Sequence, residues 1–150
     1  MKKSYLLFTV LFLTLAAMAE NISVPENWTA NINTALNNAA RENKKILILF
    51  TGSNWCKYCK LLKSEVLDQP EFKKLAAEKF IAVYFDYPTG KALPAEQKKI
   101  QQMWAKKFNV SGFPTVVILN SNGKKIGEIS GYRQNSKAEY IKQLESILKK

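Results

Sequence analysis

The stretch that decides the fold is residues 46–59, which read Ile-Leu-Ile-Leu-Phe-Thr-Gly-Ser-Asn-Trp-Cys-Lys-Tyr-Cys. Residues 46–50 are apolar without interruption and include β-branched side chains, which is typical of a strand buried on both faces. Residues 51–54 break this run with small and polar side chains. A helix should begin near Cys56 and turn inward the apolar side chains of Leu61, Leu62 and Val66. The cysteines are therefore expected where a buried strand gives way to a helix.

The spacing of Cys56 and Cys59 indicates redox chemistry. Two intervening residues bring both sulfurs together across the first turn of a helix, with Cys56 at the helix N-terminus. Unpaired N–H groups and the helix dipole favour a thiolate there, and the charge of Lys57 acts in the same direction. Because a thiolate is the species that attacks a disulfide, Cys56 is the predicted attacking cysteine. Cys59 is placed to attack the mixed disulfide and release the product.

The rest of the chain alternates predicted helices and strands. Helices are predicted over residues 26–42, from Pro70 onward, over 95–108 and over 136–149, and further strands over 81–85, 115–119 and 125–130. The Asn-Gly pair at 122–123 predicts that the last two strands form an antiparallel hairpin. An extra edge strand is expected around residues 22–24. This order predicts an α/β fold with a central mixed sheet of four or five strands, flanked by helices on both faces.

Apolar spacing also predicts which helix side chains face the core. In chain order these are Trp28, Ile32, Ala35, Leu36, Ala39, Phe72, Leu75, Ala76, Ile100, Met103, Trp104, Phe108, Ala138, Ile141, Leu144 and Leu148. Together with the strands, they are enough for one core and one domain.

The N-terminus has the pattern of an export signal. Residues 1–3 are basic, residues 6–16 are apolar apart from two threonines, and Ala17 and Ala19 suit cleavage after Ala19. Residues 1–19 are therefore predicted to be a cleavable, Sec-type bacterial signal peptide, and residues 20–150 a single domain that is periplasmic or secreted. An uncleaved N-terminal anchor is the alternative, although the apolar run is shorter than the roughly 20 residues of a spanning helix.

Composition excludes several classes of function. The formal charge is +11, or +9 once Lys2 and Lys3 leave with the signal. The lysines are spread along every element, so a solvated basic surface is expected and no nucleic-acid site. With no histidine, a Ser-His-Asp site and a Cys-His site are impossible, and a haem attachment site fails because Lys60 follows Cys59. Zinc would need two further sulfur or nitrogen ligands.

The two cysteines are therefore interpreted as a redox pair rather than a metal site. No metal and no cofactor are expected beyond the redox-active Cys56–Cys59 disulfide itself. A purely structural disulfide is the alternative, but closing so short a loop stabilises a fold little on the chain-entropy account.

A second motif, Ser111-Gly112-Phe113-Pro114-Thr115, directly precedes the predicted strand over 115–119. Residues 55–60 and 112–115 resemble the active-site motif and the cis-proline loop of the thioredoxin superfamily. The resemblance runs from Trp28 to the last helix, and residues 50–56, 70–72 and 83–88 are similar to exported bacterial thioredoxin-like proteins near the thiol-disulfide interchange proteins. It implies a thioredoxin-like fold in which Pro114 is cis and faces the two sulfurs.

The resemblance also implies roles for the residues around the sulfurs. The backbone of Phe113, in the loop it shares with Gly112, would pair with an extended substrate segment, as in strand addition. Trp55 is either a lid on the sulfurs or part of the core. Lys57 and Tyr58, between the cysteines, complete the supporting set.

One feature departs from the family pattern. Thioredoxins carry a buried aspartate in the central strand that helps to deprotonate the second cysteine, whereas residues 46–50 hold no carboxylate. Proton transfer from Cys59 must then use water or another group. Glu65 is a candidate for this role, with an ordinary surface position as the alternative.

Together these observations predict a protein disulfide oxidoreductase that acts as a reductase on disulfide- or thiol-containing exported proteins. The residues between the cysteines include no histidine and no proline, which predicts a redox potential between the extremes of about −120 and −270 mV. A membrane electron donor is expected to recharge it, and a monomer is expected because the chain has no room for a dimerisation domain. Two alternatives stay open: a non-enzymatic binding module with an inert disulfide, and a disulfide donor in oxidative folding.

Overall fold

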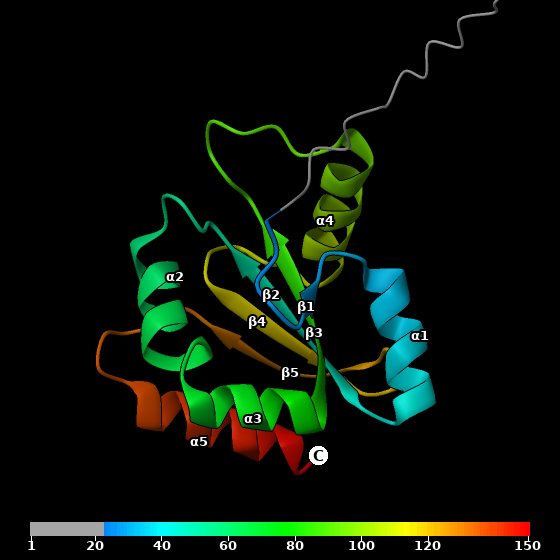
Figure 1. Cartoon of the computed structure of the whole chain (residues 1–150), viewed down its shortest axis with the longest axis vertical. Coiled ribbons are helices and arrows are strands. Elements are labelled where there is room, and N and C mark those ends of the chain that lie inside the picture. The colour runs from blue at the N-terminus through cyan, green and yellow to red at the C-terminus, as the bar shows by residue number, and fades with distance from the viewer. Residues whose placement is uncertain (1–22) are drawn as a thin grey trace, which may run out of the picture.

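The computed structural model describes residues 23–150 and contains a five-stranded sheet (Figure 1). Its strands are β1 (Trp28–Thr29), β2 (Lys45–Thr51), β3 (Phe80–Asp86), β4 (Thr115–Leu119) and β5 (Lys125–Ser130). Their order across the sheet is β1-β3-β2-β4-β5. Strand β3 pairs in parallel with β1 and β2, whereas β4 pairs antiparallel with β2 and β5. The sheet is therefore mixed, as predicted.

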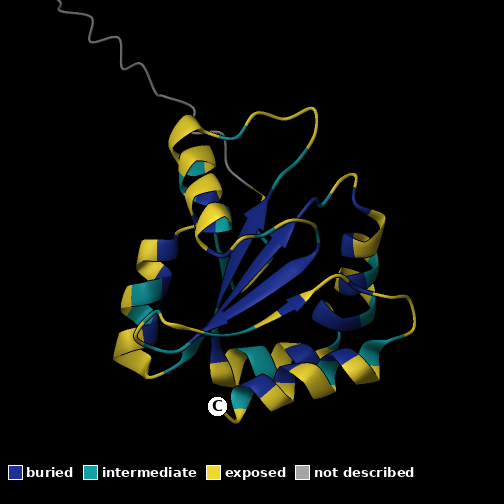
Figure 2. Cartoon of the chain, turned by 180° about the vertical axis from the view of Figure 1, so that it is seen from behind, coloured by how far each residue is buried: buried dark blue, intermediate teal, exposed yellow. Residues whose placement is uncertain are grey.

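Helices cover both faces of this sheet (Figures 1 and 2). They are α1 (Ile32–Glu42), α2 (Lys57–Leu62), α3 (Pro70–Lys79), α4 (Ala95–Lys107) and α5 (Lys137–Leu148), and a π-helical turn, η1 (Lys63–Leu67), continues α2. Helices α1 and α4 lie on one face, and α2, α3 and α5 lie on the other. The predicted α/β architecture is confirmed.

Strand β2 is the centre of the hydrophobic core. Its alternate residues Ile46, Ile48 and Phe50 pack with α1 and α4, while Leu47 and Leu49 pack with the helices of the opposite face. Successive side chains of a strand point to opposite faces, so a strand covered on both sides needs apolar residues at every position. All five are at most 3% exposed, which explains the unbroken run. The carboxyl end of β2 is thereby fixed where the cysteine loop begins.

The first helix starts later than predicted. It begins at Ile32 rather than near residue 26, because Asn31 caps it by accepting a hydrogen bond from the Thr34 N–H at 3.0 Å. Trp28, predicted on the inward face of that helix, lies instead in β1 and pairs with Ala82 of β3.

The predicted edge strand is thus present, but at β1 rather than around residues 22–24. Ser23 and Val24 form no strand, and Ile22 lies outside the described residues. Trp28 fits the sheet edge because its indole packs edge-on against Tyr84 of β3, with ring centroids 5.8 Å apart.

The buried face of α4 also differs from the prediction. Met103 is 58% exposed, whereas Gln101 is fully buried. The two large aromatic side chains Trp104 and Phe108, with ring centroids 5.4 Å apart, set the rotation of the helix. Gln101 lies three residues before Trp104 on the same stripe, so it is buried despite its polarity.

The buried residues of α5, on the other face of the sheet, also differ from the prediction. In α5, Ala138 is exposed, and the buried residues are Tyr140, Leu144 and Ile147. The large tyrosine ring sets this rotation, since it packs against Tyr132 with ring centroids 5.6 Å apart. The remaining predicted inward residues of α2, η1, α3, α4 and α5 are buried or half-buried: Leu61, Leu62, Val66, Phe72, Leu75, Ala76, Ile100, Ile141 and Leu148.

Candidate active site

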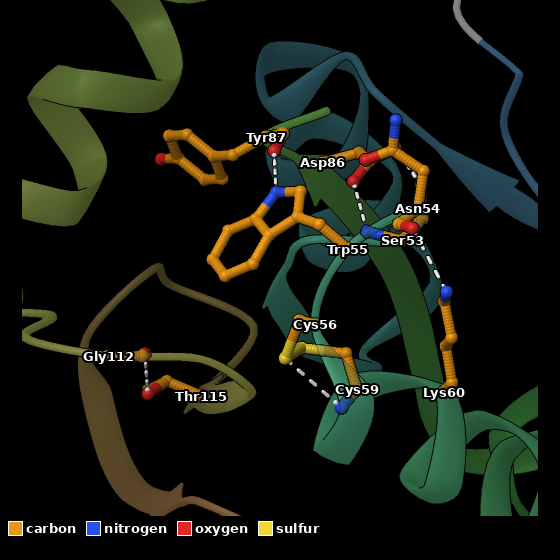
Figure 3. Close-up of a disulfide and its surroundings, with 10 residues drawn as sticks. All are labelled: Ser53, Asn54, Trp55, Cys56, Cys59, Lys60, Asp86, Tyr87, Gly112 and Thr115. Carbon is orange, nitrogen blue, oxygen red and sulfur yellow. Dashed lines mark hydrogen bonds between the residues drawn. A yellow bond between two sulfur atoms is a disulfide. The ribbon is translucent and has the colours of Figure 1, made fainter. Parts of the chain in front are cut away.

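Cys56 and Cys59 form a disulfide at the start of α2 (Figure 3). Their Cα atoms are 5.2 Å apart. Cys56 is the N-cap residue, with extended backbone, and Cys59 lies in the first turn, so the predicted position of the first cysteine at a helix start is confirmed. Both side chains are buried. The helix therefore holds the pair in a fixed position at the carboxyl end of β2.

The sulfur of Cys56 already receives a helix N–H group. The backbone N–H of Cys59 donates to Sγ of Cys56 at 3.2 Å. After reduction this donor and the helix dipole would stabilise negative charge on the same sulfur. The geometry thus favours Cys56 as the nucleophile.

A buried carboxylate, Asp86, fixes the loop before the cysteines. Its Oδ1 accepts a hydrogen bond from the Ser53 N–H at 2.8 Å, and its Oδ2 accepts one from the Ser53 hydroxyl at 2.5 Å (Figure 3). Asp86 is only 7% exposed. Next to it, the Tyr87 N–H donates to the Thr51 carbonyl at 2.8 Å. The loop is thus attached to the end of β3 as well as to β2.

Sequence reasoning missed Asp86. The residue ends the apolar run 81–85, and in the parallel pairing of β2 with β3 it lies opposite Thr51. Carboxyl ends of parallel strands meet at one edge of a sheet, which is where ligand and active sites gather in open α/β sheets. A polar residue at the end of each buried strand was therefore the available signal.

Trp55 lies on the surface of this loop rather than in the core. Its side chain is 49% exposed, and its Nε1–H donates to the Tyr87 carbonyl at 2.7 Å (Figure 3). Its ring meets Phe113 edge-on, with centroids 5.9 Å apart, and Phe113 in turn stacks on Tyr87 at 4.9 Å. This aromatic cluster, formed by Trp55, Tyr87 and Phe113, joins the cysteine loop to the loop before β4.

Tyr87 holds this cluster to α4. Its hydroxyl donates to the backbone carbonyl of Gln101 at 3.0 Å. Burial raises the pKa of Tyr87 to about 12, so the hydroxyl remains a donor at any pH near neutrality.

Gly52→Ala is expected to displace the indole of Trp55. A Cβ atom at residue 52 would lie 2.4 Å from Cε2 of Trp55, and because the indole is half exposed it would move outward rather than push the backbone. The hydrogen bond to Tyr87 and the contact with Phe113 would be lost, so the free energy of unfolding should fall by about 1–2 kcal/mol. Denaturant unfolding and the tryptophan emission spectrum measure both effects.

Gly112→Ala is the matched control for that change, because nothing lies within 4 Å of a Cβ atom added there. Equal stability and equal emission spectra of the two variants would show that Trp55 does not occupy the described position.

The loop before β4 contains the predicted cis bond, between Phe113 and Pro114. Pro114 is buried, and its carbonyl accepts a hydrogen bond from the Gly131 N–H at 2.7 Å. The Thr115 hydroxyl donates to the Gly112 carbonyl at 2.8 Å, on the segment that faces the Cys56 sulfur in Figure 3. By contrast, the N–H and C=O of Phe113 have no hydrogen-bond partner among the described residues.

The residues between the cysteines are open to solvent. Tyr58 is 52% exposed, and Lys57 is exposed and makes no ion pair within residues 23–150. The neighbouring Lys60 turns back, and its Nζ donates to the Asn54 carbonyl at 2.9 Å. A docking partner would therefore meet Lys57 and Tyr58 beside the disulfide.

Glu65, considered above as a proton acceptor for Cys59, is hydrogen-bonded to residues that precede α5. Its Oε2 accepts hydrogen bonds from the Tyr132 hydroxyl at 2.7 Å and from the Asn135 N–H at 2.9 Å. Desolvation and, second, the hydrogen bond to Glu65 raise the pKa of Tyr132 to about 12. Glu65 thus connects η1 to the segment before α5. As the sequence indicated, β2 holds no carboxylate.

Within its described part, the structure contains neither a candidate metal site nor a candidate membrane-spanning helix. Residues 23–150 contain no group of three or more acidic, histidine or cysteine side chains close enough to bind an ion. None of the helices in that range has the length and apolar composition needed to cross a bilayer.

Comparison with known proteins identifies the class to which this fold and site belong. The chain is 31% identical over 115 residues to the disulfide bond reductase DsbH of Chlamydia pneumoniae, a match that covers 77% of this chain and 69% of that protein. It is 29% identical over 129 residues to the thioredoxin-related protein DsbJ of the same organism, covering 85% of this chain but only 36% of that protein.

Solved structures agree on the fold. A DsbH oxidoreductase superposes with a TM-score of 0.71 and 27% identity, covering 87% of this chain and 92% of the other. A thioredoxin from Thermus thermophilus superposes with a TM-score of 0.62 and 22% identity, covering 81% and 86%. The protein is thus a thiol-disulfide oxidoreductase with a Cys-x-x-Cys active site. A family model described as a thioredoxin-like domain matches residues 32–148, and the chain belongs to that family.

Proposed function

We propose that the protein reduces disulfides of exported proteins through Cys56 and Cys59. The observation that carries this proposal is the position of Cys56, whose sulfur caps α2 and accepts the Cys59 N–H at 3.2 Å. In the reduced protein, the Cys56 thiolate attacks a substrate disulfide and forms a mixed disulfide, releasing one substrate thiolate. Cys59 then attacks Cys56, which releases the second substrate thiolate and leaves the disulfide seen in the structure. Two electrons pass to the substrate in each cycle.

The direction of electron flow is supported by two observations. No histidine or proline lies between the cysteines to make the protein a strong oxidant. The relative that is 31% identical is named a disulfide bond reductase. A thiol-based electron donor at the membrane would return the Cys56–Cys59 disulfide to the reduced form after each cycle.

Substrate docking is proposed at Phe113. Its N–H and C=O have no partner among the described residues, and the residue is half-buried in the loop between Gly112 and Thr115, so an extended substrate segment could pair with them as an added strand. The exposed faces of Trp55 and Tyr58 and the backbone at Gly112 would contact the same segment. Lys57 would favour substrates with negative charge next to their cysteine.

The proposed location is the periplasm or the exterior of a bacterial cell. The predicted signal peptide, residues 1–19, lies outside the described residues, so this part of the proposal depends on the sequence pattern. An oxidising compartment also suits a protein whose two cysteines form a disulfide.

The redox equilibrium with glutathione tests the direction of electron flow between the protein and its substrates. We expect a potential between about −120 and −270 mV, and we expect wild type to reduce insulin, seen as turbidity, while Cys56→Ser does not. A potential at the strong-oxidant end would instead favour a disulfide donor in oxidative folding. Equal insulin reduction by wild type and Cys56→Ser would favour a binding module with an inert disulfide.

A further inference from the structure

Helix α4 carries an unbalanced positive charge. It contains four lysines and one glutamate, Glu96, which gives it a net charge of +3. The other long helices are close to neutral: α1 has one arginine and one glutamate, α3 has three lysines and two glutamates, and α5 has two lysines and two glutamates. No lysine of α4 forms an ion pair within residues 23–150. The described part of the protein therefore leaves this charge uncompensated.

The lysines of α4 surround an exposed apolar side chain, Met103. Lys99, Met103 and Lys106 follow one another at spacings of four and three residues, which places them on one face of the helix, and Lys107 lies four residues after Met103. All four residues are exposed, and Figure 2 shows the exposed outward side of α4. We call these four residues the α4 face. It has an apolar centre and a cationic surround.

The opposite side of α4 fixes this face toward solvent. Gln101, Trp104 and Phe108 are buried on the side that packs against the sheet. The Nζ atom of Lys107 lies 4.3 Å from the centroid of the Trp104 ring, so this lysine stem lies over the aromatic ring while its charge stays at the surface. Because the two aromatic residues set the rotation of the helix, Met103 remains 58% exposed.

The composition of the α4 face favours an anionic lipid surface over a protein as its partner. Protein–protein interfaces are enriched in arginine and aromatic residues and depleted in lysine. The α4 face has three lysines and one methionine, with no arginine and no exposed aromatic side chain. Attraction to an anionic leaflet requires only cationic groups near the lipid phosphates, and each one strengthens binding about fivefold. Lysine stems also lie along apolar surfaces while their ammonium groups stay in water, which lets Met103 enter the headgroup layer between them.

We propose that the α4 face binds the phosphate headgroups of an anionic phospholipid membrane. Helix α2 covers the opposite face of the sheet (Figure 1), so a protein bound through α4 leaves Lys57 and Tyr58, between the cysteines, open to substrates. Such binding would concentrate the protein at the surface that holds its proposed electron donor. No redox step takes part in it, so lipid binding goes beyond the proposed function and does not depend on it.

Co-sedimentation with lipid vesicles tests this proposal. The protein used begins at residue 20, so that the apolar residues 6–16 contribute nothing to lipid binding and every described element is kept. It should bind vesicles made of equal parts of phosphatidylglycerol and phosphatidylcholine, and it should not bind vesicles of phosphatidylcholine alone. Binding should be lost from about 0.1 M to about 1 M salt, because the Debye length falls from about 10 Å to about 3 Å.

The double variant Lys99→Gln/Lys106→Gln removes two charges from the α4 face. Glutamine forms helices about as well as lysine, so the helix should be kept. The affinity for the anionic vesicles should fall about twenty-five-fold, since each of the two lysines contributes about fivefold.

Lys74→Gln/Lys142→Gln is the matched control. Lys74 of α3 and Lys142 of α5 are exposed, form no ion pair within residues 23–150, and belong to helices on the other face of the sheet. This variant has the same net charge as the first, but its affinity should stay within about threefold of wild type because distant charges are screened. Both variants should keep the urea midpoint of wild type, which shows that they are folded.

Two results would overturn the proposal: equal weakening in the two double variants, which would mean that only the net charge matters, or equal binding of wild type to neutral and anionic vesicles. The measurement needs no disulfide exchange. A failure to reduce insulin would therefore reject the proposed function without affecting the result with vesicles.

Discussion

Cys59→Ser should accumulate mixed disulfides between Cys56 and the protein's natural substrates. The attacking cysteine keeps its position at the start of α2, where free N–H groups favour the thiolate, but the group that resolves the mixed disulfide is gone. Turnover on insulin should fall to the uncatalysed rate. Covalent complexes should appear on a non-reducing gel of an extract of exported proteins, and mass spectrometry would identify the captured substrates.

The matched control carries both Cys56→Ser and Cys59→Ser. It presents the same surface without a nucleophile, so every complex should disappear. If Cys59→Ser captures nothing while Cys56 still reacts with a small alkylating agent, protein substrates are excluded for this site. If the double variant captures the same proteins, the complexes do not form through Cys56.

Phe50→Ala should cause the largest loss of stability of any change discussed. Phe50 of β2 is fully buried on the face of the sheet that α1 and α4 cover, and its ring meets Phe85 of β3 edge-on at a centroid distance of 5.5 Å. Removing a buried phenylalanine ring costs about 3–5 kcal/mol. Small domains are stable by only about 5–15 kcal/mol, so the urea midpoint should fall markedly. The cysteine loop follows this end of β2. We therefore also expect the reaction rates of the Cys56 and Cys59 thiols to vary more among the molecules of this variant.

Met103→Ala provides the comparison, because this large apolar side chain is 58% exposed. Its change in unfolding free energy should stay within about 0.5 kcal/mol. A loss below about 1 kcal/mol in Phe50→Ala would contradict the packing described at the end of β2.

Patterns among residues close together in the sequence were sufficient to predict most of the fold. The unbroken apolar run at 46–50 is buried on both faces, and the hairpin signalled by Asn-Gly joins β4 and β5 at the predicted residues. These features depend on neighbours close in the sequence, where strand period and turn chemistry act directly. The start of α1 was missed because the cap by Asn31 outweighed the helical spacing of Trp28.

Only part of the site could be predicted, because some of its contacts join residues that are far apart in the sequence. Cys56 and Cys59 are three residues apart, so helix geometry alone places one sulfur near the other. The contacts of Asp86 with Ser53 and of Tyr87 with Trp55 join segments more than thirty residues apart, and they depend on β2 and β3 being neighbours in the sheet. Gln101 is buried because aromatic neighbours set the rotation of α4, which hydrophobicity alone does not reveal.

The short strand β1 has a practical consequence for recombinant production. Trp28 and Pro25 form part of the wall of a cavity of about 30 Å³ that Cys59 also lines, so the segment before α1 contributes to the surroundings of Cys59. An expressed fragment that begins at α1 would remove that wall and admit bulk water to Cys59. The choice of first residue therefore changes the solvent around the resolving thiol, and kinetic data should be collected on protein that includes residues 23–31.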